Sequence, residues 1–220
     1  MHPLLAELVT QFQAQAYKEI LPSNGPVRTQ VVGAKSPDSE AQADRVREFM
    51  NYQLMNVMEE YDTETDQLLF YLPLSGSAFR KVYYDQNLGR AVSRFIPAED
   101  LVVPYATTDI YSASRITHVV DMSMNDIKKL QKAGFYRDVE ISDSMLIDTD
   151  TDEIQEEIDE LQGMEPSYGE SDQCELYEIH TDLDIPGYED LDAEGEPTGI
   201  KLPYVVTLST TTNEVLSIRR

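Results

Sequence analysis

The chain has 220 residues, of which 41 are Asp or Glu and 17 are Lys or Arg, so its formal net charge at pH 7 is -24. A surface this acidic repels nucleic acid, which excludes tight wrapping of DNA by the chain alone and leaves cations and basic proteins as partners. The single cysteine, Cys174, excludes an internal disulfide, and we expect it to be buried and inert. No apolar run reaches the length of a membrane span, and the N-terminus lacks the features of a signal peptide.

The negative charge is concentrated in one part of the chain. Residues 140–196 contain 22 Asp or Glu and no Lys or Arg, which leaves 19 acids against all 17 bases in the remainder. The remainder is therefore nearly neutral, and the acidic segment governs which molecules can approach the chain.

The first part of the sequence predicts helices. Leucines and other apolar residues recur at helical spacing over residues 3–20, and the run LPSNGP at 21–26 ends that helix. A long helix is expected to begin near residue 38, and its candidate caps are Ser36, Asp38 and Ser39. Its apolar stripe consists of Val46, Phe49, Met50, Leu54, Val57 and Met58.

A third helix is expected to follow closely. It should start at Asp62 or Thr63, because Thr63 followed by Asp66 resembles a capping box. Pro73 should kink or end it, since proline has no N–H to donate and its ring clashes with the preceding turn. Glycine and serine at 76 and 77 then predict a turn.

Beyond this turn the pattern favours antiparallel strands. Alternating, aromatic-rich segments predict two strands at 79–85 and 90–96, joined by a turn at 86–89. An irregular loop is expected at 97–109, and further strands at 114–122, 174–185, 204–209 and 214–220. Ser123 should cap a helix over about 124–133 that Gly134 ends. The acidic segment should hold a short helix at 148–163, and 186–199 should form a long acidic connection.

These elements predict an α+β fold, with N-terminal helices followed by antiparallel β-hairpins and short packed helices. We expect a helical part at residues 1–76 and a β-rich part at 77–220, with an acidic insert at 140–197. The last strand runs into Arg219 and Arg220 without a terminating signal, so the natural protein is expected to continue beyond them.

The acidic segment offers the sharpest candidate for metal binding. Asp148, Asp150 and Asp152 have the spacing of the first three ligands of an EF-hand loop. However, Glu153 stands where that loop needs glycine, and Asp159 stands where it needs a bidentate glutamate. We therefore favour acids at a helix N-terminus, where they interact favourably with the helix dipole.

No other pattern predicts a chemical site. A second acidic cluster has irregular ligand spacing and reads as a solvated loop, and its members are Asp182, Asp184, Glu189, Asp190 and Asp192. The three histidines form no metal-binding pattern, and no phosphate-binding loop or nucleophile motif is present. We expect no catalytic residues, no cofactor and no enzyme activity.

Three consecutive segments carry a resemblance to a known family. They are LLFYLPLSGSAFRKVYYD, RFIPAEDLVVPYATTDI and SRITHVVDMSMNDIKKLQKAGFY, and the later pieces HTDLDIPGYED and PYVVTLS are similar in kind. Over roughly residues 40–220, this order of elements resembles the portal proteins of short-tailed bacteriophages. The stretch at 66–110 is the most specific part of the resemblance.

The resemblance implies a structural role. Portal proteins form a ring, usually of twelve subunits, at one vertex of the capsid, where the ring docks the terminase motor, passes DNA without specific binding and later holds the tail. The chain would be one wing domain truncated at both ends, contacting neighbouring subunits, capsid and scaffold proteins, with the segments that grip terminase and tail lying elsewhere. Its location would be the virion, after assembly in the host cytoplasm, with no membrane partner.

Two alternatives remain open on the sequence. The first is an acidic protein-binding or cation-binding module without catalytic activity, motivated by the charge of residues 140–196. The second is a hydrolase that uses paired carboxylates such as Asp148 and Asp150, which would require a concave pocket and perturbed pKa values.

Overall fold

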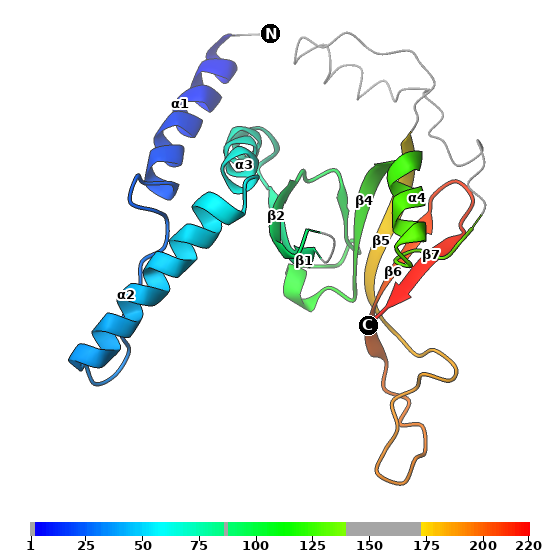
Figure 1. Ribbon diagram of the computed structural model, residues 1–220. Helices are drawn as coiled ribbons and strands as arrows, with labels where there is room; N and C mark the ends of the chain where they lie inside the picture. Colours follow the sequence, from blue (N-terminus) through cyan, green and yellow to red (C-terminus); the bar gives the residue numbers. More distant parts are fainter. Residues whose placement is uncertain (1–2, 86–87, 140–172) are drawn as a thin grey trace. The chain divides into compact units, whose positions relative to one another are not determined.

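The computed structural model describes residues 3–85, 88–139 and 173–220 (Figure 1). The described residues form a mixed α+β structure in which three N-terminal helices precede mostly antiparallel strands and a short helix, so the predicted fold class is confirmed. The chain divides into two units, Met1–Ala98 and Glu99–Arg220, which are described separately. The first unit contains the expected helical part together with the first hairpin.

The first two helices begin and end near the predicted positions. Helix α1 spans Pro3–Ile20 and α2 spans Pro37–Tyr52, with a π-helical turn, η1, at Gln53–Val57. Ser36 caps α2: its hydroxyl accepts from the Ser39 N–H at 3.1 Å, and the Ser39 hydroxyl accepts from the Ser36 N–H at 2.9 Å. Of the three expected caps, the structure selects Ser36.

Helix α3 spans Tyr61–Ser75, and its predicted capping box is wrong. The N-cap is Glu60, which makes no side-chain capping bond, and Thr63 lies inside the helix. Asp66 instead accepts a hydrogen bond from Gln13 Nε2 of α1 at 2.6 Å, so a tertiary contact takes the carboxylate that the sequence pattern assigned to the cap.

The C-terminus of α3 lies slightly beyond the expected position. Pro73 lies within the last turn, and the helix continues to Ser75. Gly76 then ends it with a left-handed backbone at φ 76°, where its N–H donates to the Leu72 carbonyl at 2.9 Å. A residue with a Cβ would be strained at this φ, which explains glycine here.

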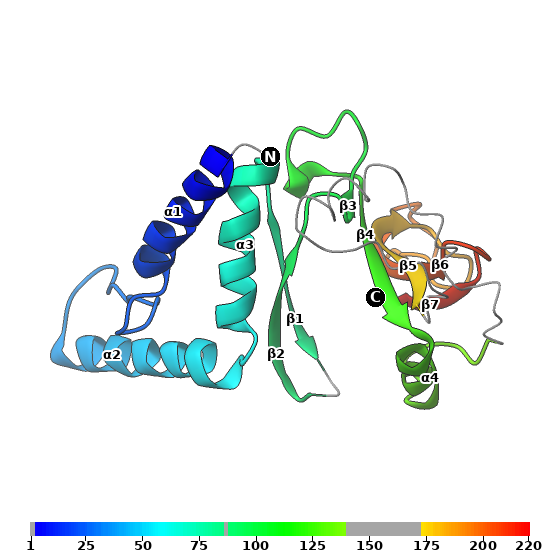
Figure 2. The same ribbon diagram turned by 90° about the horizontal axis from the view of Figure 1, so that it is seen from above.

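Helix α3 is the centre of the first unit, with α1 on one side and a hairpin on the other (Figure 2). The hairpin consists of β1, Phe79–Asp85, and β2, Arg90–Ile96, paired in register from Phe79 opposite Ile96 to Asp85 opposite Arg90. Both strands confirm the predictions. Of their connection at 86–89, residues 86 and 87 lie outside the described part.

The second unit is built on a five-stranded antiparallel sheet in the order β3-β4-β5-β6-β7. The predicted strands are present, with the two-residue β3 added and a 3-10 turn, η2, at Ile110–Ser112 before β4. The strands span Leu101–Val102, Arg115–Ser123, Gln173–Leu183, Leu202–Ser209 and Val215–Arg219.

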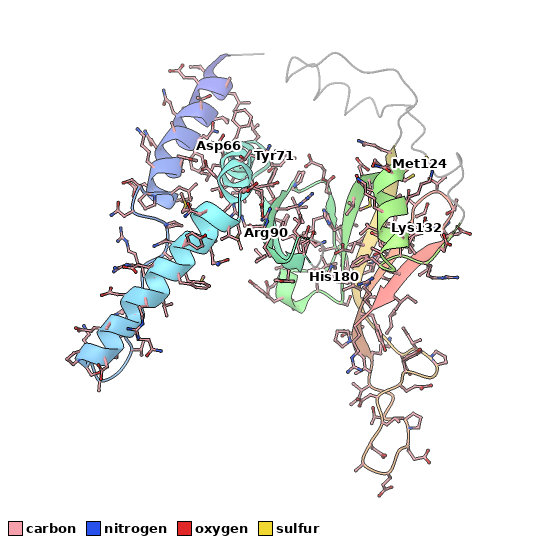
Figure 3. All side chains as sticks on the ribbon, in the orientation of Figure 1. Asp66, Tyr71, Arg90, Met124, Lys132 and His180 are labelled. Atoms are coloured by element: carbon pink, nitrogen blue, oxygen red, sulfur yellow. The ribbon has the colours of Figure 1, made fainter. Side chains whose placement is uncertain are left out.

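Helix α4, Met124–Lys132, packs on this sheet and completes its core; its ends are labelled in Figure 3. Ser123 caps the helix as expected, accepting from the Asp126 N–H at 3.2 Å. The core joins side chains from α4, the following turn, β5 and β7, namely Ile127, Tyr136, Cys174, Leu176 and Leu216, none more than 8% exposed. Cys174 is fully buried, as expected.

Candidate interaction surfaces

Helix α1 has apolar side chains on two faces, and only one of them is covered. Val9 is 2% exposed and lies on the α3 side, where Tyr17 also hydrogen-bonds the Asp62 carboxylate. Leu4, Leu8 and Phe12 lie on the other face, because each is within about a quarter-turn of Leu4 around the helix axis. They are 58%, 62% and 41% exposed, respectively. The described part of the first unit provides no cover for this apolar stripe.

Helix α2 is even less covered, since none of its residues is buried. It extends away from α1 and α3 (Figure 1), and its apolar face leaves Val46 47%, Phe49 60% and Met50 41% exposed. The helix is held by polar contacts with the preceding loop, where Thr29 Oγ1 donates to the Ala43 carbonyl at 3.0 Å. We call the exposed faces of α1 and α2 together the apolar surface; its residues are Leu4, Leu5, Leu8, Phe12, Val46, Phe49 and Met50.

A polar groove of about 800 Å³ lies between α2 and the loop before it. Asn51 lines it, accepting from the Val27 N–H at 2.9 Å and donating to the Val27 carbonyl at 3.2 Å. Gly25, at φ 91°, is needed here, because the Asn51 side chain occupies the space that a Cβ would fill. Arg28, Arg47 and Glu48 also line the groove, and Arg47 pairs with Asp44 at 2.9 Å.

Glu60, the N-cap residue of α3, and Glu64, in its first turn, bind the outer edge of β2. The Ser93 N–H donates to Glu60 at 3.3 Å, and the Phe95 N–H donates to Glu64 at 2.6 Å. Arg90, labelled in Figure 3, donates to both carboxylate oxygens of Glu60 at 2.9 and 2.7 Å. Burial opposes ionisation of Glu60, but bonds from its own N–H, Arg90 and Ser93 outweigh it and hold its pKa below the usual range.

The acidic residues of the second unit behave differently. Burial raises the pKa of Asp100, and the nearby carboxylates of Glu99, Asp121 and Glu175 raise it further. Burial alone raises the pKa of Asp121. The described residues include no group of three or more His, Cys, Asp or Glu placed to hold a metal ion.

Four members of the second acidic cluster lie in the connection between β5 and β6, where much of their bonding serves the loop's own structure. The expectation of a loop is wrong for Asp182, which lies in β5 opposite Pro203. Asp192 accepts from the N–H groups of Glu194 at 2.9 Å and Glu196 at 3.0 Å. Asp190 accepts from the Thr198 hydroxyl at 2.8 Å, and these bonds fold the connection back on itself. The carboxylates of Glu194 and Glu196 remain exposed to solvent.

The metal candidates Asp148, Asp150 and Asp152, like the helix expected at 148–163, lie outside the described residues, so they remain predictions. His118 and His180 lie in β4 and β5, as expected, and His180 Nε2 is 2.8 Å from a carboxylate oxygen of Glu178.

The contact of Glu60 and Glu64 with β2 was not foreseen. Its only signal in the sequence is two glutamates four residues apart, which lie on one face of a helix.

Among the described helices, none combines the length and the apolar composition that crossing a membrane requires. No family model matches the chain, and a search of curated proteins finds no relative of it.

Proposed function

We propose that the chain is a non-enzymatic structural subunit, the wing region of a bacteriophage portal ring through which DNA enters and leaves the capsid. The observation that carries the proposal is the apolar surface of α1 and α2, where seven large side chains are each at least 41% exposed. On each helix these side chains share one face, and monomeric proteins rarely leave extended apolar patches open to water. Such a face is typical of a subunit that is completed by its neighbours.

The distribution of charge supports the same role. The first unit has 12 Asp or Glu and nine Lys or Arg, which gives a formal charge of -3. The second unit has 29 Asp or Glu and eight Lys or Arg, which gives a formal charge of -21. A nearly neutral apolar surface allows copies to approach each other, because like-charge repulsion is weak there. A strongly acidic second unit would let DNA slide past without binding.

The other partners follow from the same proposal. Neighbouring subunits would cover the apolar surface, and capsid and scaffold proteins would contact the outside of the ring. Terminase and tail proteins would bind the assembled ring. DNA would be cargo rather than a ligand with its own site.

Electron microscopy of the purified protein tests the proposal directly. We expect closed rings, and uniformly monomeric particles would contradict the proposal. A variant carrying Leu8→Asp and Phe49→Asp should lose the rings, since it places a charge in each half of the apolar surface. The matched control, Ala14→Asp with Ala41→Asp, adds the same charges to exposed positions of the same helices outside that surface and should keep them.

A second candidate function is an acidic module that captures basic proteins or cations. The observation in its favour is the excess of 21 negative charges in the second unit. Stoichiometric capture of a basic host protein by the monomeric chain, without ring formation, would favour this candidate.

A further inference from the structure

The loop before α2 is attached to that helix at two points. Thr29 Oγ1 donates to the Ala43 carbonyl at 3.0 Å, and the backbone of Val27 exchanges hydrogen bonds of 2.9 and 3.2 Å with the Asn51 side chain. Ala43 and Asn51 lie about two helical turns apart, so they share one face of α2. The loop therefore runs along this face, in the direction opposite to that of the helix.

Two arginines lie between these attachments. Arg28 is the residue between the two attached loop residues, and Arg47 lies midway between Ala43 and Asn51, about one turn from each. Both arginines line the groove between the loop and the helix. The two attachments thus bring two positive charges into the same stretch of one groove.

The described residues leave the positive charge of the groove incompletely balanced. Arg28 is exposed and makes no ion pair with the described part of the chain. Arg47 pairs with Asp44, but the two side chains are 43% and 60% exposed, and ion pairs this exposed are weak. Glu48 is the one carboxylate among the described groove-lining residues, so positive side chains outnumber negative ones there.

The remaining groove residues supply hydrogen-bonding groups and an aromatic ring. Ser23, Asn24 and Asn56 offer a hydroxyl and two amides, and Tyr52 and Met55 are 57% and 43% exposed. The groove volume of about 800 Å³ lies in the range of sites for small organic molecules and is larger than a phosphate ion requires. The groove is therefore suited to an anion that carries a larger organic part.

We infer that the groove binds a nucleoside monophosphate. Guanidinium groups recognise phosphate through paired, charge-assisted hydrogen bonds, so the phosphate lies between Arg28 and Arg47. Nucleobases stack on exposed aromatic rings, so the base lies against Tyr52. Tyr52 follows Arg47 by five residues, which places it about 7.5 Å further along the helix, a separation that the ribose spans.

The groove is separate from the apolar surface, so the inference goes beyond the proposed function. Phe49 follows Arg47 by two residues and is therefore turned by about 200° around the helix axis. A neighbour that covers Phe49 leaves the groove accessible. Rings without nucleotide binding would overturn this inference alone, whereas nucleotide binding by a protein that stays monomeric would support it and contradict the portal function.

Titration of the 220-residue chain with 5′-AMP, followed by protein NMR, tests the site. We expect saturable shifts confined to residues 22–29 and 47–56, with a dissociation constant of about 1 mM or lower. Inorganic phosphate and adenosine should each bind more weakly, because each lacks one half of the ligand. Absent binding, or shifts confined to the second unit, would overturn the inference.

The arginine variants locate the phosphate. Arg28→Gln and Arg47→Gln should each weaken AMP binding about tenfold, because each removes a charge-assisted contact. Arg45→Gln is the matched control, since it removes the same charge from an exposed position of α2 outside the groove lining, and it should leave the affinity unchanged. An equal loss in the control would mean general charge attraction and would overturn the site.

Glu48→Gln gives a prediction that misfolding cannot imitate. Its carboxylate lines the groove and repels the phosphate, so the substitution should strengthen AMP binding about threefold. Unchanged or weaker binding would place the phosphate away from Arg47 and would overturn the arrangement.

Tyr52→Leu tests the position of the base. The substitution should weaken AMP binding about fivefold and leave the binding of inorganic phosphate unchanged, because only the base contacts the ring. Equal affinities of the unmodified chain for AMP and inorganic phosphate would overturn the assignment of a nucleotide. A short single-stranded oligonucleotide without a terminal phosphate should bind more weakly than AMP, and tighter binding would make the groove a nucleic-acid contact instead.

Discussion

The two units of the molecule bury their apolar side chains in different ways. In the second unit, side chains from α4, β5 and β7 converge in one core that contains the fully buried Ile127 and Leu216. In the first unit the buried side chains are scattered, and α2 contributes none of them. The second unit therefore supplies its own stability, whereas the first holds much of its apolar surface available for a partner.

The largest effect is expected in the core of the second unit. Leu216→Ala should lower its free energy of unfolding by about 2–5 kcal/mol, because the substitution leaves a cavity among closely packed side chains. Amide hydrogen exchange measures the loss of stability in each unit separately. Exchange in β5–β7 should accelerate strongly while exchange in α1 and α3 stays the same, and equal acceleration in both units would contradict their independence.

A smaller effect is expected where α3 meets β2. Glu60→Gln should lower the stability of the first unit by about 1.5 kcal/mol at neutral pH, since it weakens charge-assisted bonds to Arg90 and Ser93. Because the pKa of Glu60 is lowered in the folded state, its stabilisation is present above the usual glutamate range and is lost as the pH falls through the folded pKa. In the Glu60→Gln variant, the free energy of unfolding of the first unit should therefore fall less steeply as the pH is lowered. Amide hydrogen exchange measured at several pH values tests this.

The second unit provides the contrast for that measurement. Burial raises the pKa of Asp100 and Asp121, so the folded state binds more protons than the unfolded state between the ordinary and the raised values. Their contribution is complete below the ordinary aspartate range and is lost as the pH rises. The two groups of carboxylates should thus give pH trends of opposite sign, and Glu60→Gln should alter only the trend of the first unit.

Removal of the α2 cap should have a more modest effect. Ser36→Ala deletes the hydroxyl that accepts from the Ser39 N–H, and such substitutions lower stability by about 1 kcal/mol. The change should appear as faster exchange of the first-turn amides of α2. Ser36→Asp keeps an acceptor at the cap and should retain most of the protection, so equal loss in both variants would argue against the cap.

The smallest effect on the stability of the isolated chain is expected on the apolar surface. Phe49→Ser should change the free energy of unfolding by no more than about 0.5 kcal/mol, because Phe49 is 60% exposed. Self-association, measured by sedimentation, should nevertheless weaken. A large loss of stability without any change in association would show that Phe49 packs within its own chain.

The sequence predicts the elements well where periodicity and turn residues act locally. The strand boundaries at 79–85 and 90–96 agree with the structure, and so do the Ser123 cap and the helix it begins. Local reasoning failed at Thr63 and Asp66, because Asp66 is used by Gln13, 53 residues away. The π-helical turn after α2 was likewise not predicted, since the apolar pattern continues across it.

The candidate surfaces could be predicted only in part. The leucines of α1 show that one face is apolar, but their spacing does not say whether another element covers it. Glu60 and Glu64 acquire their role from the alignment of α3 with the edge of β2, which depends on the tertiary arrangement. The basic character of residues 79–96 is visible in the sequence, whereas the pairing of Lys81 with Arg94 in the strand register is seen in the structure.

The glutamates on the edge of β2 also limit how far sheets can grow. A hairpin with two bare edges would accept a strand on each side, and such additions propagate into fibrils without a defined end. With Glu60 and Glu64 already bonded to one side, growth through this hairpin stops after a single addition. A finite number of copies then becomes the natural end point, even at high local concentrations.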